Sequence, residues 1–129
     1  MPDHPLYFIK AIRDRIIDFL IADSLKKADF LLLSADKRLA SAAVLVEKGK
    51  PELAETTASK GQVYLARSIS EVEKAKSEGK ETTTFITKLT SAIEKHEEVV
   101  RDIVTKTNGP VKDRFTAMLD ELNKQRKSL

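Results

Sequence analysis

Hydrophobic residues recur at steps of three and four along most of the chain. The run over residues 24–48 shows this spacing with Leu25, Ala28, Leu32, Ala35, Leu39, Ala42 and Val46. The run over 83–107 repeats it with Ile86, Leu89, Ile93, His96, Val100 and Ile103. Such spacing puts one apolar stripe on an α-helix, whereas a half-buried strand needs alternation with a period of two. The pattern therefore predicts an all-α protein.

Glycine and proline interrupt the pattern at few places. Gly49-Lys50-Pro51 and Asn108-Gly109-Pro110 each join a residue that ends helices to one that suits the first turn of the next helix. Gly79 ends another run, and a hydroxyl of Thr82 or Thr83 is expected to cap the helix that follows. Asp23-Ser24 is the expected cap between the first two segments. These signals predict five helices, over residues 5–21, 24–48, 51–78, 83–107 and 110–126.

Short turns between helices of similar length favour antiparallel neighbours. We therefore expect one domain over residues 1–129, an antiparallel helical bundle with three long helices. A shorter helix flanks these three at each end. The chain has 129 residues, of which 41% are hydrophobic, and this is enough for one core without cross-links.

Gly61 is the only glycine within a periodic run. It costs a helix about 1 kcal/mol relative to alanine. Its stripe is made mostly of small residues: Ala54, Ala58, Gly61, Leu65, Ser68, Val72 and Ala75. We expect close packing of two helices at Gly61 to compensate, with a plain loss of helicity as the alternative.

The first segment has the widest apolar face. Tyr7, Phe8, Ile17, Phe19 and Ile21 widen a stripe that already runs along one side. The segment has three candidate locations: a groove of the bundle, an interface with a second subunit in a homodimer, or a membrane surface. The candidate interaction surface comprises Leu6, Tyr7, Ile9, Ile12, Ile16, Phe19 and Leu20.

Composition removes several kinds of chemistry. The chain has no cysteine, which excludes disulfides, thiolate nucleophiles and cysteine-ligated zinc. The net charge of +3 is small and mixed, so we expect no nucleic-acid partner. The basic tail residues Lys124, Arg126 and Lys127 are interpreted as a solvated, fraying C-terminus. No apolar run approaches the roughly 18 residues that a membrane span needs.

The two histidines, His4 and His96, give no recognised metal motif. Di-iron bundles need a glutamate three residues before a ligating histidine, and that position before His96 is Ile93. Because His96 falls on an apolar stripe, we interpret it as a buried histidine bonded to a polar side chain on a neighbouring helix. A lone metal site made of His96, Glu97 and a distant carboxylate stays open as the alternative.

No catalytic constellation stands out. The glycines at 49, 61, 79 and 109 do not cluster into a phosphate-binding loop, and no G-x-S-x-G elbow is present. We predict a protein that is not an enzyme, with no catalytic residues, metal ligands or cofactors. Met1-Pro2-Asp3 lacks the basic start and apolar region of a signal peptide. The expectation is either a cytoplasmic protein or a mature domain from a longer precursor.

Four stretches resemble one family, the bacterial and archaeal domain of unknown function 5667, over about residues 2–107. They are Pro2-Asp3-His4-Pro5-Leu6-Tyr7 with Lys10, Lys37-Arg38-Leu39-Ala40, the turn from Glu47 to Leu53, and His96-Glu97-Glu98-Val99-Val100. Met1 stands where the family usually has leucine. The resemblance implies a location outside the cytoplasm or near the membrane, and it carries no enzymatic activity.

These observations lead to one main functional hypothesis and two alternatives. The main one is a non-enzymatic, extracytoplasmic interaction or spacer domain whose partner is a protein, either a second copy or an envelope component. The first alternative is a ligand or metal sensor with a pocket between helices near His96 and Tyr64. The second is association with a membrane surface through the first helix.

Overall fold

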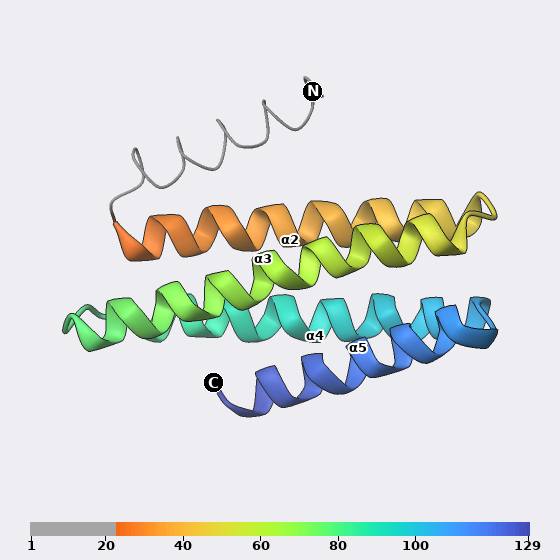
Figure 1. Ribbon diagram of the computed structural model, residues 1–129. Helices are drawn as coiled ribbons and strands as arrows, with labels where there is room; N and C mark the ends of the chain where they lie inside the picture. Colours follow the sequence, from red (N-terminus) through yellow and green to blue (C-terminus); the bar gives the residue numbers. More distant parts are fainter. Residues whose placement is uncertain (1–22) are drawn as a thin grey trace, which may run out of the picture.

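The computed structural model describes residues 23–129. These residues form four helices, α2 (Ser24–Glu47), α3 (Pro51–Ser77), α4 (Thr83–Lys106) and α5 (Gly109–Lys127), with no strand in this part of the chain (Figure 1). The all-α class is therefore confirmed. The expected count of five helices is not matched, because the expected helix over 5–21 lies outside the described residues. The bounds of the other four differ by only one residue from the expected ranges.

The helix ends follow the chemistry of their capping residues. Asp23 caps α2, since its carboxylate accepts the backbone N–H groups of Leu25 and Lys26 at 2.9 and 3.1 Å. Gly49 follows α2 with φ of +73°, a left-handed conformation that glycine adopts without strain. The expected hydroxyl cap of α4 is wrong: Thr82 makes no side-chain capping bond, and the Glu81 carboxylate accepts the N–H of Thr83 instead.

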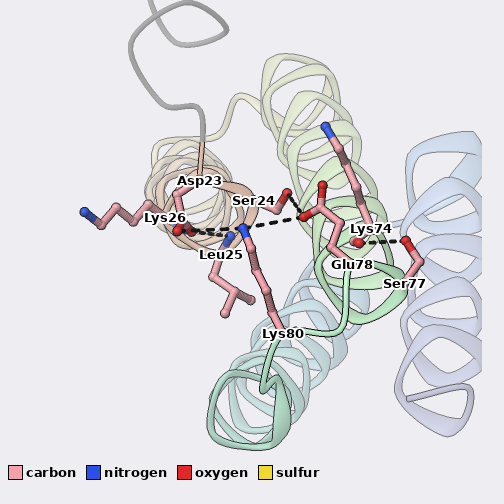
Figure 2. Close-up of polar contacts among 8 residues, drawn as sticks. All are labelled: Asp23, Ser24, Leu25, Lys26, Lys74, Ser77, Glu78 and Lys80. Atoms are coloured by element: carbon pink, nitrogen blue, oxygen red, sulfur yellow. Dashed lines mark hydrogen bonds and ion pairs between the residues drawn. The ribbon is translucent and has the colours of Figure 1, made fainter.

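A polar cluster ties the start of α2 to the turn that follows α3 (Figure 2). The Ser24 hydroxyl donates to Glu78 at 3.2 Å. Lys80 lies 3.5 Å from the same carboxylate and 3.8 Å from Asp23, which also caps α2. Hydrogen bonds from the backbone of Lys26 lower the pKa of Asp23, and the charge of Lys80 adds to this effect. The beginning of α2 is thus fixed to the turn that joins the two halves of the fold.

The four helices form two hairpins, α2–α3 and α4–α5, whose helices run in opposite directions (Figure 1). The hairpins stack so that α2 contacts α4 and α3 contacts α5. Within each stacked pair the helices are parallel. The ion pairs Asp29–Lys88 and Glu47–Lys106 join corresponding ends of α2 and α4. The ion pair Glu55–Arg114 joins the N-terminal parts of α3 and α5. The expectation that consecutive long helices are the packed neighbours is therefore wrong for α3 and α4, which make no extensive contact.

The core lies between the two hairpins, and every described helix contributes to it. Helix α5 is the shorter helix expected at the C-terminal end, and it supplies a full share of the core and completes the second hairpin. Its buried stripe recurs at helical spacing, which explains this role. The fully buried large side chains come from all four helices: Leu31, Leu32, Leu65, Leu89, Ile93, Val100, Ile103, Phe115 and Leu122.

Helices α2 and α3 approach closely at Gly61. A Cβ atom built there would lie 3.1 Å from the Cβ of Arg38 and 3.3 Å from the carbonyl oxygen of Ala35. Both atoms belong to the α2 backbone or are attached directly to it, so neither moves independently of the helix. The close packing expected at Gly61 is confirmed.

Gly61→Ala is expected to lower the free energy of unfolding by about 1 kcal/mol. The substitution gains about 1 kcal/mol of helix propensity, but crowding at a packed contact costs about 1–3 kcal/mol. Urea unfolding measures the balance. Ser70→Ala, at an exposed position of the same helix, is the control and should be neutral or slightly stabilising. A gain in stability for Gly61→Ala would contradict the tight contact.

Candidate functional site

Helix α4 buries two adjacent polar residues, His96 and Glu97. Successive residues of a helix point about 100° apart, so the two side chains leave α4 in different directions. His96 reaches α2, whereas Glu97 reaches α5. Helix α4 is thus joined by a polar contact to each of these two neighbours.

The His96 imidazole bonds to Asp36 of α2. Its Nε2 lies 2.6 Å from Asp36 Oδ1, and the side chains are 6% and 46% exposed, respectively. With the proton on Nε2, the ring donates to the carboxylate. The histidine is therefore the buried partner of the pair, and the carboxylate is the partner that meets water.

This contact is one of three that join α2 to α4. Asp29 pairs with Lys88, Asp36 with His96, and Glu47 with Lys106. The acidic partners lie two and about three turns apart along α2, so all three project from the same side of that helix. Each partner follows its acid by 59 or 60 residues. The constant separation fixes α2 and α4 in a parallel register.

A hollow of about 340 Å³ opens on the α2–α4 seam beside His96. Its lining is largely apolar, and the charged groups at its edge are Asp36 and Lys95. Tyr64 does not line it: this ring lies on α3, with the Arg38 guanidinium 5.8 Å from its centre. The hollow therefore lies beside His96 as expected, but Tyr64 is not part of its lining. It is lined by Asp36, Leu39, Ala40, Ala92, Lys95, His96 and Val99.

Glu97 makes the other polar contact of α4. Its Oε1 accepts the Nε of Arg126 at 2.6 Å, and its side chain is 6% exposed. Asn123 also donates to this carboxylate, at 3.4 Å. Burial raises the pKa of Glu97, but the bonds from Arg126 and Asn123 outweigh it, so the net shift of the pKa is downward. The same pairing raises the pKa of Arg126.

The Glu97–Arg126 pair corrects the interpretation of the basic tail. Arg126 was expected to belong to a solvated, fraying C-terminus, but it lies within α5 and holds a buried carboxylate. Sequence reasoning missed this role because Glu97 has Arg101 one turn away as an apparent partner. In the structure Arg101 adds only the effect of its charge on the pKa of Glu97. No local spacing indicates a partner 29 residues away.

His96 and Glu97 do not form one metal site in the structure. His96 and Glu97 reach different neighbouring helices, so they do not converge on one point. Within residues 23–129 no three or more histidine, aspartate or glutamate side chains are grouped to hold a metal ion. Among α2 to α5, no helix is both long and apolar enough to cross a membrane.

The other sequence-predicted site residues lie outside the described part of the chain. This applies to His4 and to the whole candidate interaction surface of Leu6, Tyr7, Ile9, Ile12, Ile16, Phe19 and Leu20.

Residues 23–129 form two stacked helical hairpins joined by polar side-chain pairs, and this part of the chain is an all-α helical domain. The chain belongs to the family described as a domain of unknown function (DUF5667), which matches residues 1–125. A comparison with curated proteins found no match, and a comparison with solved structures found none either.

Proposed function

We propose that this is a non-enzymatic interaction or spacer domain that acts outside the cytoplasm and presents a rigid helical surface to a protein partner. The proposed extracytoplasmic location rests on the resemblance to the family whose model matches the chain. The partner is either a second copy of the chain or an envelope component.

The observation that carries the proposal is the bracing of every main helix contact. Three polar contacts join α2 to α4, Glu97–Arg126 joins α4 to α5, and Arg114–Glu55 joins α5 to α3. The hydroxyl of Ser68 on α3 donates to the buried carbonyl oxygen of Ala28 on α2 at 2.7 Å. Side chains fixed in this way hold a surface in one geometry, which reduces the entropy lost when a partner binds.

The hollow beside His96 is the surface best suited to a partner. Leu39, Ala40, Ala92 and Val99 form an apolar lining that takes an aliphatic side chain, and Lys95 supplies a cation at the edge. A partner segment with an aliphatic residue next to a carboxylate complements both features. We therefore place the partner's contact at the α2–α4 seam.

The test is a pull-down from the native cell envelope with the full chain as bait. Ala40→Arg fills the hollow from α2 and is expected to abolish capture of the specific partner. Ala66→Arg, the same substitution at an exposed position of α3, is expected to leave capture unchanged. Equal capture by both variants would exclude the α2–α4 seam, and no specific capture at all would leave only the spacer role.

A ligand sensor is the second candidate function, and the hollow beside His96 favours it. A bound ligand stabilises the folded state by mass action, about 2.7 kcal/mol at a hundredfold excess over the dissociation constant. Thermal unfolding with divalent metal salts and a library of small amphipathic compounds would detect such binding. A shift lost in both Ala40→Arg and His96→Ala would favour the sensor, whereas no shift with any compound would count against it.

A further inference from the structure

Helix α2 is apolar on two opposite faces. One face carries Ala28, Ala35 and Leu39 into the core. The other carries Phe30, Leu33 and Val44, which are 37%, 51% and 51% exposed. These three account for most of the large hydrophobic residues that are exposed in the described chain, since only Leu53 and Val63 join them.

The exposed large hydrophobic residues of α2 share one side of the helix. At 100° per residue, Phe30, Leu33 and Val44 fall within about 60° of one another around the helix, and they span about 21 Å along it. Lys37 lies on the same side between Leu33 and Val44. We call Phe30, Leu33, Lys37 and Val44 the outer strip of α2. A helix with apolar residues on both sides is typical of one that has neighbours on both sides.

We propose that the outer strip is the docking site of residues 5–21 of the same chain, packed as a helix antiparallel to α2. This inference does not depend on the proposed function, because it concerns a different face of α2. Two other occupants of the strip, a second copy of the chain and a membrane surface, are outcomes of the test.

Chain connectivity supports this occupant. Only residue 22 and the capping residue Asp23 separate residue 21 from α2, so a helix over residues 5–21 would begin its contact near the Phe30 end of the strip. A helix over residues 5–21 would be about 26 Å long, close to the span of the strip. An equally short connection joins α4 to α5, and these two helices pack as antiparallel neighbours.

The apolar pattern and the extent of the family match agree with this arrangement. The segment provides aliphatic side chains along its whole length. The family match runs from residue 1 to residue 125 and so includes this segment together with α2 to α5. A segment that lies within the matched unit is a natural partner for a face of that unit.

A cross-linking experiment on the full chain tests the proposal. Because the chain has no cysteine, introduced thiols react without background. Ile9 and Lys37 lie at equal distances in sequence on either side of Asp23, so antiparallel packing brings them together. We expect Ile9→Cys with Lys37→Cys to give an intramolecular product with a short bis-maleimide. Ile9→Cys with Val63→Cys, on α3, is the matched control, with at least a tenfold lower yield expected.

Each other outcome overturns the proposal. Similar yields for the two pairs would mean that the segment has no fixed position on α2. Products that link two chains, with a dimer by light scattering, would assign the strip to a second copy. Loss of the intramolecular product on vesicles of phosphatidylglycerol, with flotation of the protein, would assign it to a membrane surface.

A stability measurement gives an independent readout. Leu33→Glu is expected to lower Tm by about 5 °C or more, because docking would bury the new charge without a partner. Val63→Glu, at a position that is 61% exposed, should change Tm little. Equal and small changes for both variants would show that the outer strip faces water, which would overturn the proposal.

Discussion

Phe115→Ala is expected to lower the free energy of unfolding by about 3–5 kcal/mol, the usual cost of removing a buried aromatic side chain. Phe115 is fully buried and is the largest such side chain of the described residues. It lies on α5, the shorter helix at the C-terminal end. Its removal would leave a cavity where α5 meets the shared core.

Urea unfolding followed by circular dichroism measures this loss. Leu53→Ala is the control, since that side chain is 51% exposed and its truncation should cost less than about 0.5 kcal/mol. A loss below about 1 kcal/mol for Phe115→Ala would mean that α5 is not an integral part of the core. The stacked hairpins would then be the wrong description of the fold.

Arg126→Met is expected to lower Tm near pH 7 by about 5 °C or more, because it leaves the Glu97 carboxylate buried without its main partner. Breaking a buried pair by removing one member costs more than the pair contributes, since the remaining charge has lost its solvation. Lys124→Met, an exposed change in the last turns of the same helix, is the control and should alter Tm little.

The same pair predicts a dependence of stability on pH. The folded-state pKa of Glu97 is lowered from its ordinary value of 4.5, so its contribution is present above about pH 4.5. It is lost as the pH falls through the folded-state pKa. In Arg126→Met, burial still raises the pKa of the Glu97 carboxyl, but the bond from Arg126 no longer lowers it. Protonation of Glu97 at low pH then removes the free-energy cost of an unpaired buried charge.

The difference in Tm between the wild-type protein and Arg126→Met should therefore shrink as the pH falls from near 7 to near 3. The matched control is the difference in Tm between Glu97→Gln and the double variant Glu97→Gln with Arg126→Met. Neither protein has a carboxyl at position 97, so this difference should not narrow as the pH falls. A difference that stays constant with pH would contradict the role of the Glu97 charge.

Local features of the fold were accessible from the sequence because they depend on nearby residues. The bounds of α2 to α5 follow from helical spacing together with Asp23, Pro51 and the glycines after α2 and α3. The close contact at Gly61 also left a local trace, a glycine within a stripe of small residues. Its counterpart on α2, however, became known only with the packing of the two helices.

The candidate site was accessible only in part. His96 stood out because a polar residue on an apolar stripe must find a partner, yet nothing in the sequence indicated Asp36. Lys95 and Ala92 had no visible role before α4 was placed beside α2, which opened the hollow between them. Arg126 was misread because its partner Glu97 lies on another helix.

The sequence by itself determined the helical class, the helix ends and the buried face of each helix, since these depend on residues within a few turns of one another. Only the tertiary structure decided that the second hairpin stacks on the first with α2 parallel to α4. Helices can pack on one another in several arrangements with the same buried faces. The choice among them lies in contacts between distant residues, such as Asp36 with His96 and Glu97 with Arg126.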